Sequence, residues 1–371
     1  MSASNRRSFL LGSLAASSLL AADAGKPIRL GFIGVGNRGG YHLTQFIKLP
    51  GVKVTALCDI KPDRLDKAAT TAAKDDPFTT ADYKKLLARD DVDAVIIATP
   101  CDLHVEMAIA ALKAGKHVYC EKPLGITPES IERLIKVVKA SDKVFQVGQQ
   151  MRSYARLGKT IEHIHDGVAG KVIMVKAQRF SSQDLNHEGM SKDWFFNAKR
   201  SGDVIVEMSV HNLDVCNWVI GAHPERAAGF GGTLKWIDSP PGRTNMDGYS
   251  LTYQYPGNVV LSYEQVFFHP SKMPGGGRGT YVYGTKGAVD LNNATFYPDA
   301  AAADTTPRVL VPEMEEDRAA HMKAFLATIR GERTTPAGID IGATGAMTAI
   351  LGREAIYRKQ VTEWSKLAPG I

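Results

Sequence analysis

The chain has 371 residues and a formal net charge of +6, with 44% hydrophobic and 23% charged residues. That length exceeds one typical domain of roughly 100 to 200 residues, so we expect two domains. The basic residues are scattered rather than gathered in blocks, which argues against a nucleic-acid partner. The four cysteines lack the spacing of a disulfide framework or a zinc site, and we interpret them all as small core residues: Cys58, Cys101, Cys120 and Cys216.

The first 24 residues have the pattern of an export signal. Arg6 and Arg7 precede an apolar stretch over residues 9–20, and an A-x-A cleavage site follows at residues 22–24. The apolar stretch is shorter than the roughly 20 residues that a membrane-spanning helix needs. We therefore predict a twin-arginine (Tat) signal peptide over residues 1–24, the Tat export machinery as a partner, and a periplasmic or otherwise exported protein.

Residues 25–150 alternate between strand and helix patterns, which predicts a doubly wound parallel sheet of the Rossmann type. One helix is expected to begin at Asp102, whose side chain would cap the first turn, and another at Thr127 before Pro128. Short apolar runs typical of strands covered on both faces occur at Ile28–Ile33, Val52–Cys58, Ala94–Ala98, His117–Cys120 and Val144–Val147.

The pattern changes after Gln150, and residues 151–371 are predicted to form a second, α+β domain. Longer strand-like runs there predict an open, mainly antiparallel sheet, with loops at the Pro- and Gly-rich stretches between them. These runs are Lys171–Phe180, Tyr249–Tyr255, Val259–Phe268 and Thr280–Tyr283. Helices are expected at Tyr154–His165, Glu315–Arg330 and Gly342–Arg358, the last two without a predicted place in the fold.

A glycine-rich turn follows the first predicted strand and precedes a helical run. The turn has the pattern G-x-G-x-x-G and contains Gly34, Gly36, Asn37, Arg38 and Gly39. Its glycines permit a tight turn and close approach of a pyrophosphate, and the helix N-terminus supplies partial positive charge. Asp59 ends the next strand about 20 residues later, where a carboxylate accepts hydrogen bonds from ribose hydroxyls. We therefore predict NAD as the cofactor, with NADP possible because Lys61 and Arg64 lie nearby in the sequence.

Three further strand ends supply residues for the same crevice, because ligands bind at the carboxyl ends of the strands in an open α/β sheet. These residues are Thr99 and Pro100, then Glu121, Lys122 and Pro123, then Gly148 to Gln150. The ATP run with His104 four residues after Pro100, the AGKHVYCEKP run, and a later G-x-x-x-x-E-x-x-x-H-x-x-D element resemble the Gfo/Idh/MocA oxidoreductases. The resemblance covers nearly the whole chain after residue 24.

This resemblance implies a catalytic Lys122 beside the nicotinamide and the substrate hydroxyl, with Glu121 and Pro123 shaping the cofactor site. It also implies a homo-oligomer, a dimer or tetramer, in which the open sheet packs against another subunit. The expected cofactor-binding residues are Gly34, Gly36, Asn37, Arg38, Gly39, Asp59, Thr99, Pro100, His104, Glu121, Lys122 and Gln150.

The later element places Glu207, His211 and Asp214 at i, i+4 and i+7, which predicts that they share one helical face. His211 is the expected base, with Glu207 as a second catalytic group, although the family usually has Asp and Gly where this chain has Glu207 and Ser209. The alternatives are a core histidine and, for Asp214, a buried structural partner. We expect no metal site, because His211 and Asp214 lack a third ligand at suitable spacing.

The segment over residues 181–200 mixes polar groups with aromatic ones and suits a sugar that stacks on an aromatic ring. We expect Arg152, Trp194 and Asp214 on the substrate side; alternatively, the aromatic side chains only fix this loop to the core. As chemistry, a neutral His211 would take the proton of a secondary hydroxyl while Lys122 stabilises the charge on its oxygen.

Three functions remain open from the sequence. The first is a sugar or polyol oxidoreductase with a tightly held cofactor. The second is an NAD-dependent glycoside hydrolase that works by transient oxidation, elimination and re-reduction. The third is a binding or regulatory relative without catalysis, and the presence of Lys122 and His211 argues against it.

Overall fold

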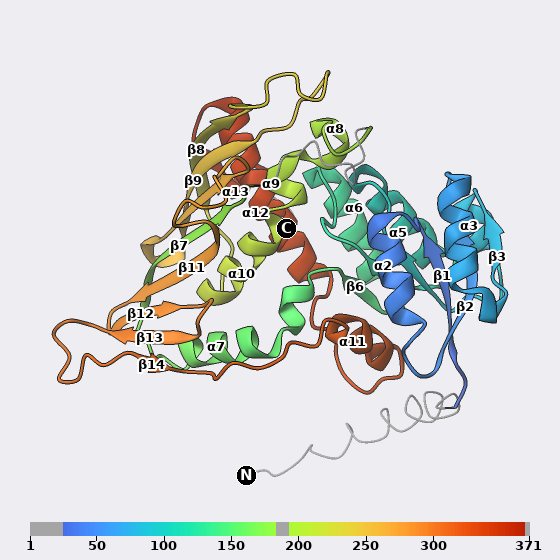
Figure 1. Ribbon diagram of the computed structural model, residues 1–371, viewed down its shortest axis with the longest axis horizontal. Coiled ribbons are helices and arrows are strands. Elements are labelled where there is room, and N and C mark those ends of the chain that lie inside the picture. Colours follow the sequence, from blue (N-terminus) through green and yellow to red (C-terminus); the bar gives the residue numbers. More distant parts are fainter. Residues whose placement is uncertain (1–24, 183–192, 368–371) are drawn as a thin grey trace, which may run out of the picture.

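The computed structural model describes residues 25–182 and 193–367, so the predicted export signal lies outside the described residues. The described chain forms two units side by side, a Rossmann unit and a unit built on a larger sheet (Figure 1). Within the described residues no helix is both long and apolar enough to cross a membrane.

The Rossmann unit contains, among the described residues, a six-stranded sheet in the order β3-β2-β1-β4-β5-β6, with every pairing parallel. Its strands are nearly all buried, which explains why they appear as continuous apolar runs in the sequence. The strands are β1 (Ile28–Ile33), β2 (Val52–Cys58), β3 (Phe78–Thr80), β4 (Ala94–Ile97), β5 (His117–Cys120) and β6 (Phe145–Val147).

Helices cover both faces of this sheet. They are α2 (Asn37–Phe46), α3 (Pro62–Thr71), α4 (Tyr83–Leu87), α5 (His104–Lys113) and α6 (Pro128–Lys139). Helix α11 (Ala320–Ile329) comes from near the C-terminus and packs on the same face as α2, where Met322 and Phe325 join the core formed by Leu30 and Phe32. The Rossmann core is therefore completed by a distant part of the chain.

The second unit contains, within the described residues, a nine-stranded sheet in the order β14-β13-β12-β11-β7-β10-β9-β8-β15. Only the β7–β10 pairing is parallel among the pairings of this described sheet. The strands are β7 (Val172–Phe180), β8 (Arg226–Gly232), β9 (Gly248–Tyr255), β10 (Val259–Val266), β11 (Gly277–Gly284), β12 (Gly287–Asp290), β13 (Thr295–Pro298), β14 (Arg308–Val309) and β15 (Thr362–Glu363).

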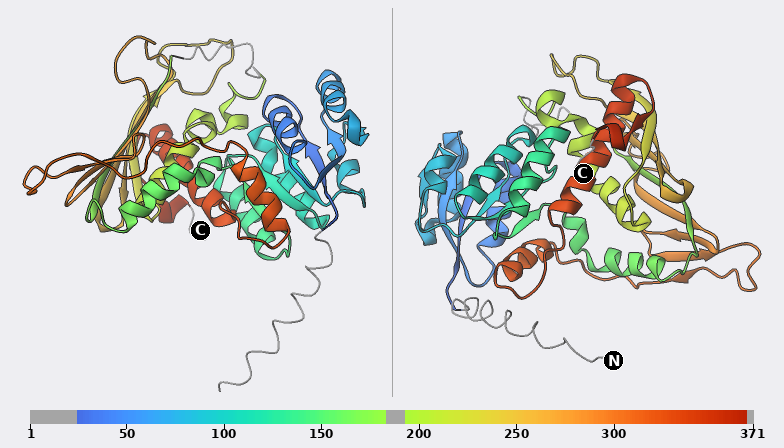
Figure 2. Two further views of the ribbon diagram at one scale, coloured as in Figure 1. Left: turned by 60° about the horizontal axis from the view of Figure 1, so that its bottom comes forward. Right: turned by 180° about the vertical axis from the view of Figure 1, so that it is seen from behind.

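One face of this large sheet carries helices and the other is open (Figure 2). The long α12 crosses between the two units and touches α6, α9, α10, β6 and β8. The helices of this unit are α7 (Ala155–His165), α8 (Ala198–Ser201), α9 (Asp203–Glu207), α10 (Val210–Ile220), α12 (Ile339–Arg358) and α13 (Trp364–Leu367). Short 3-10 turns occur at Ala73–Asp75, Cys101–Leu103, Gln150–Ser153 and Pro256–Asn258.

The predicted fold class, a Rossmann sheet followed by an α+β unit with an open and mainly antiparallel sheet, is confirmed. The predicted cap at Asp102 was wrong. A 3-10 turn over Cys101–Leu103 precedes α5, and the Asp102 carboxylate accepts a hydrogen bond from Arg200 Nε at 3.0 Å instead. Thr127 does cap α6, by accepting a hydrogen bond from the Ser130 amide. All four interpreted cysteines are buried and free.

Candidate active site

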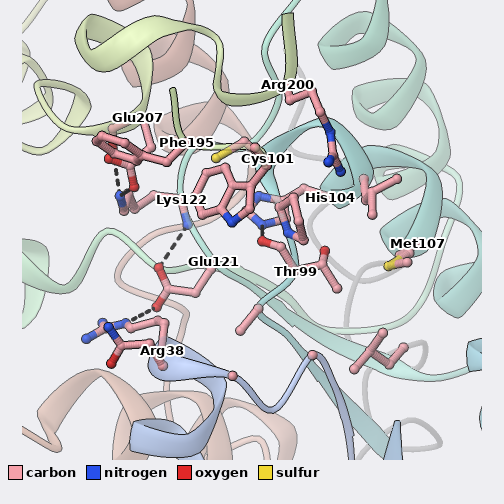
Figure 3. A pocket seen from close by; sticks show the side chains of 18 of the residues that line it. Arg38, Thr99, Cys101, His104, Met107, Glu121, Lys122, Phe195, Arg200 and Glu207 are labelled. Carbon is pink, nitrogen blue, oxygen red and sulfur yellow. Dashed lines mark hydrogen bonds and ion pairs between the residues drawn. The ribbon is translucent and has the colours of Figure 1, made fainter. Parts of the chain in front are cut away.

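A cavity of about 510 Å³ opens where the two units meet. The Rossmann unit lines it with the ends of β1, β2, β4 and β5, and the second unit lines it with residues of β7, β11 and the α9–α10 region. A single chamber therefore joins the predicted nucleotide crevice to residues from the second unit. Figure 3 shows part of this lining, with Lys122 turned toward Glu207 and Glu121 turned toward Arg38.

The glycine-rich turn fits a dinucleotide pyrophosphate. Gly34 has φ +84° and a side chain there would approach the Ala98 carbonyl oxygen to 2.7 Å, while a side chain at Gly39 would come within 1.8 Å of the Gly34 oxygen. Helix α2 begins at Asn37 without a side-chain cap and without an acidic residue in its first turn. Its free amides and positive end are thus left for an anionic ligand.

Asp59 holds the turn against the end of β2. It is 7% exposed, and its Oδ2 accepts a hydrogen bond from the Val35 amide at 2.9 Å. Its Oδ1 accepts another from the Lys61 amide at 2.9 Å. Asp59 lines the cavity and each of its oxygens can accept a further hydrogen bond, so the carboxylate fits the ribose role predicted for it and also fixes the backbone around it.

His104 links the next two strand ends. Its buried ring places Nδ1 2.8 Å from the Pro123 carbonyl oxygen and Nε2 2.9 Å from that of Thr99. A neutral imidazole has one N–H, so it donates to one of these carbonyls at a time. Burial lowers the pKa of His104, which keeps the ring neutral. Thr99 Oγ1 lies buried without a partner among the described residues, beside the cavity.

Glu121 is the centre of a buried network beneath the cavity. Its Oε1 accepts hydrogen bonds from His42 Nε2 at 2.6 Å and from Arg38 Nε at 2.8 Å. Burial acts to raise the pKa of Glu121, but the charge of Arg38 and the contact with His42 bring it well below its usual value. The carboxylate therefore stays ionised, and Oε2 accepts a further hydrogen bond from the Lys122 amide at 3.1 Å. This network fixes the backbone on which Lys122 stands.

Lys122 and Glu207 connect the two units inside the cavity. Lys122 Nζ lies 2.5 Å from Glu207 Oε1 and 2.6 Å from the Glu207 carbonyl oxygen, and the two side chains are 16% and 14% exposed. Glu207 is the last residue of α9, so it approaches Lys122 from the second unit. The longer carboxylate of this chain reaches the lysine directly.

The prediction of one helical face for Glu207, His211 and Asp214 was wrong. The Ser209 amide donates to the Val204 carbonyl five residues earlier, at 3.3 Å, and the helix breaks between α9 and α10. The Ser209 hydroxyl is also tied to Tyr249 and Gln265 of the sheet. Glu207 and His211 thus line the same cavity from two separate helices.

His211 is 8% exposed and points Nδ1 at Gln149 Oε1, 3.1 Å away. An amide oxygen only accepts, so with the Gln149 amide in this orientation Nδ1 carries the ring proton and Nε2 is left as a proton acceptor. Burial, with a smaller contribution from the Lys122 charge, lowers the pKa of His211 well below its usual value. The ring is therefore neutral at physiological pH.

The structure does not bring Arg152 and Asp214 into the cavity. They pair with each other, with Arg152 Nη2 2.7 Å from Asp214 Oδ1, and the guanidinium stacks over Trp218. Burial raises the pKa of Asp214. Neither residue is among those that line the cavity, so both act as a structural pair. Trp194, in contrast, lines the cavity and packs edge-on against Phe195.

The remaining predicted cofactor residues all border the cavity: Gly34, Gly36, Asn37, Arg38, Pro100 and Gln150. Gly39 lies buried behind them. The sequence placed Gln149 in a strand-end run of the crevice but did not predict its pairing with His211, and it did not indicate two arginines of the large sheet, Arg179 and Arg278. No local motif marks these arginines, because only the pairing of β7 with β11 brings them together. Among the described residues no group of three or more potential ligands is placed to hold a metal ion.

Comparison with known families agrees with this geometry. The family model described as "Oxidoreductase family, NAD-binding Rossmann fold" matches residues 28–149, and that described as "GFO/IDH/MocA C-terminal domain" matches residues 159–290. The chain belongs to the GFO/IDH/MocA oxidoreductase family. Its Rossmann unit is NAD-binding, as predicted.

Several curated relatives of this GFO/IDH/MocA chain carry glycosidase names. It is 37% identical over 164 residues to a "Glycosyl hydrolase family 109 protein" of Saccharopolyspora erythraea, covering 42% of this chain and 35% of that protein. It is 31% identical over 197 residues to an "Alpha-N-acetylgalactosaminidase" of Shewanella oneidensis, covering 50% and 43% respectively. The chain thus spans about two fifths of the length of the curated relatives it matches. For one such relative, from a Shewanella species, the match covers 41% of that protein.

Among solved structures, levoglucosan dehydrogenase in complex with NADH superimposes with a TM-score of 0.77 at 18% identity, covering 91% of this chain and 99% of that one. At this identity the likeness shows the fold.

Proposed function

We propose that this chain oxidises a secondary hydroxyl of a sugar or polyol and holds its nicotinamide cofactor tightly. The observation that carries the proposal is the meeting of Lys122 and His211 in one cavity, at the end of a nucleotide crevice. The cofactor, when bound, supplies the hydride acceptor. The NADH-bound neighbour and the family assignment support this choice of chemistry.

His211 acts as the proton acceptor in this proposal. Its pKa is depressed, so the ring is neutral and Nε2 takes the proton of the substrate hydroxyl without first losing one of its own. Lys122 donates a hydrogen bond to the same oxygen and stabilises the negative charge that develops there. Glu207 is a positioning residue, because its carboxylate and its carbonyl oxygen both hold Lys122 Nζ.

Glycoside hydrolysis is the second candidate, and the names of the curated relatives favour it. The same oxidation would acidify a neighbouring C–H bond, and loss of that proton would expel the glycosidic oxygen as the alcohol by elimination. Water would then add to the resulting double bond, and the hydride would return to the carbonyl of the sugar. Net oxidation and redox-neutral hydrolysis therefore use the same residues for their first step. The difference lies in the fate of the oxidised sugar.

One experiment separates the two candidates. The purified, NAD-loaded chain is mixed with free sugars and with matching aryl glycosides, and reduced nicotinamide is followed by absorbance together with product release. Lasting reduction by a free sugar supports the oxidoreductase, and glycoside cleavage without net reduction supports the hydrolase. If neither occurs with any sugar tested, the proposed function is wrong.

We also propose export through the Tat route, based on Arg6 and Arg7 and the apolar stretch that follows them. A cofactor carried across the membrane would then have to be regenerated in place. The hydrolase would return the hydride to its own substrate, and the oxidoreductase would pass it to a second, oxidised substrate. Fractionation of cells that express the chain tests the proposal. We expect the protein outside the cytoplasm, and retention inside when both arginines are replaced by lysine; an unchanged distribution would contradict the proposal.

A homo-oligomer is proposed from the open face of the large sheet. Large apolar side chains are exposed on its neighbouring strands β7 and β11, including Ile173, Met174, Tyr281 and Tyr283. Contiguous exposed apolar surface is typical of an interface. Light scattering after gel filtration is expected to give the mass of a dimer or tetramer, and a monomer mass would contradict the proposal.

A further inference from the structure

Two arginines stand side by side in the cavity wall. Arg179 on β7 and Arg278 on β11 are direct cross-strand partners in the antiparallel pairing, and both line the cavity. Arg179 Nη1 donates to the Met208 carbonyl oxygen at 2.9 Å, which points that side chain at the break between α9 and α10. Both guanidinium groups therefore belong to the wall contributed by the second unit, opposite the glycine-rich turn.

Like charges directly opposite each other destabilise a sheet, so this pair is costly by itself. Within the described residues neither arginine has a carboxylate within ion-pair distance. Three other cations of the cavity lining each pair with a carboxylate: Arg38 with Glu121, Lys122 with Glu207 and Arg200 with Asp102. The wall contributed by the second unit thus holds two positive charges that no carboxylate of the described residues pairs with, in addition to Lys61 and Arg64 in the nucleotide crevice.

These charges lie at the substrate end of the cavity and not at its adenosine end. After burial and Lys122, the charges of Arg278 and Arg179 also act to lower the pKa of His211. Burial, and next the charge of Arg179, lowers the pKa of Arg278 itself. The cross-strand pairing of the two arginines, their place in the cavity lining and the bond from Arg179 to the Met208 carbonyl oxygen put the two guanidinium groups on the same wall as the proposed base. The nucleotide phosphates, in contrast, belong at the start of α2 on the opposite wall.

We infer that the sugar oxidised at this site carries an acidic substituent, a carboxylate, sulfate or phosphate, which Arg179 and Arg278 bind. This inference rests on the proposed function and adds the substrate class to it. A pair of guanidinium groups matches the geometry of such an anion and forms charge-assisted hydrogen bonds with it. The bound anion would also remove the repulsion between the two cross-strand arginines.

The test compares binding of acidic and neutral sugars to the NAD-loaded chain by calorimetry. The probes are hexoses of the gluco, galacto and manno series, each with its uronate, 6-sulfate and 6-phosphate. We expect at least one acidic probe to bind about 10- to 100-fold more tightly than its neutral hexose, since a hydrogen bond to a charged group contributes about 1.5–3 kcal/mol. The probe that binds most tightly identifies which acidic group the site prefers.

Arg278→Gln is expected to remove most of this preference, and Arg278→Lys is expected to keep part of it because the charge remains. Lys176→Gln is the matched control, because Lys176 is an exposed cation on β7 that does not line the cavity. This control is expected to bind the acidic probe as the parent does.

Several results would overturn the inference: equal binding of acidic and neutral sugars, no measurable binding of any acidic probe, or the same loss in Arg278→Gln as in Lys176→Gln. The comparison within the parent protein needs no variant, so a misfolded variant leaves the test intact. Binding is measured without turnover. Tight binding of an acidic probe that neither reduces the cofactor nor is cleaved as a glycoside would uphold the anion-binding role of Arg179 and Arg278 while refuting the proposed function.

Discussion

Replacing Lys122 with methionine removes the ammonium group and keeps a side chain of similar length. In the structure this group donates to the carboxylate and to the carbonyl oxygen of Glu207, at 2.5 and 2.6 Å. The Glu207 side chain is only 14% exposed, so the variant leaves a largely buried carboxylate without its cation. A fully buried pair would lose about 3–5 kcal/mol on such a change. The remaining exposure reduces this to about 1.5–3 kcal/mol, the contribution of a hydrogen bond to a charged group.

The same variant is expected to lose about 10²- to 10³-fold in kcat, the usual effect of removing one donor to a developing oxyanion. Glu207→Gln in the parent should lower kcat less, because an amide oxygen still accepts from Lys122. In the Lys122→Met background, Glu207→Gln should change kcat little and should restore stability, because Glu207 acts through Lys122 and no buried charge remains.

A double-mutant cycle measures both effects, with urea unfolding of the cofactor-stripped proteins and turnover of the loaded ones. We expect a coupling free energy of about 1.5–3 kcal/mol between the two residues. Lys136→Met is the control, since Lys136 forms an exposed pair with Glu132 on α6, 2.9 Å apart, and exposed pairs contribute about 1 kcal/mol or less. Additive effects on stability, or turnover of Lys122→Met within threefold of the parent, would refute the assignment.

Three further predictions concern single residues. Asp59→Asn should weaken NAD binding about tenfold or more and reduce the preference for NAD over NADP. Titration with both nucleotides measures this, and an unchanged ratio of the two dissociation constants would show that the assignment is wrong. The acid limb of kcat/KM should lie below pH 6.5, because the pKa of His211 is lowered; His211→Asn should lose that limb along with most activity, and a limb retained in this variant contradicts its role. Burial lowers the pKa of His321 to about 3, so the unfolded chain takes up a proton there that the folded chain does not. The stabilisation that comes from keeping this ring neutral is complete above pH 6.5 and is lost as the pH falls toward 3. Between pH 6 and 4, the free energy of unfolding of His321→Asn should therefore fall less steeply than that of the parent, by about 1.4 kcal/mol per pH unit. An equal slope in both proteins would contradict this.

Site residues could be predicted from the sequence where their role depends on a short run of neighbouring residues. The glycine-rich turn and the EKP run each carry their chemistry within a few neighbouring residues, and the structure places both at strand ends around one cavity. Buried parallel strands were visible as apolar runs for the same reason. In contrast, β8 has the glycine-rich sequence RAAGFGG and its residues are mostly exposed or half-buried, so neither its hydrophobicity nor its composition marks it as a strand.

Residues that depend on long-range pairing could not be predicted. Arg179 and Arg278 are brought together only by the register of β7 and β11, and the ion pair of Arg152 with Asp214 joins positions 62 residues apart. The helix break before α10 depends on contacts of Ser209 with side chains of the sheet, so periodicity alone gave a continuous helix. Sequence patterns show which residue types are present, and tertiary packing decides which of them face the cavity.

The central claim is that Lys122 and His211 act on a sugar hydroxyl beside a carried nicotinamide. Its most direct test is a single-turnover measurement on the NAD-loaded chain, in which reduced nicotinamide is followed by absorbance after mixing with sugars and glycosides. We predict rapid reduction, lasting or transient, with at least one of them, and reduction about 10²- to 10³-fold slower in Lys122→Met loaded with the same amount of NAD. Absence of reduction in the parent with every sugar that binds, or equal reduction in the variant, would contradict the account.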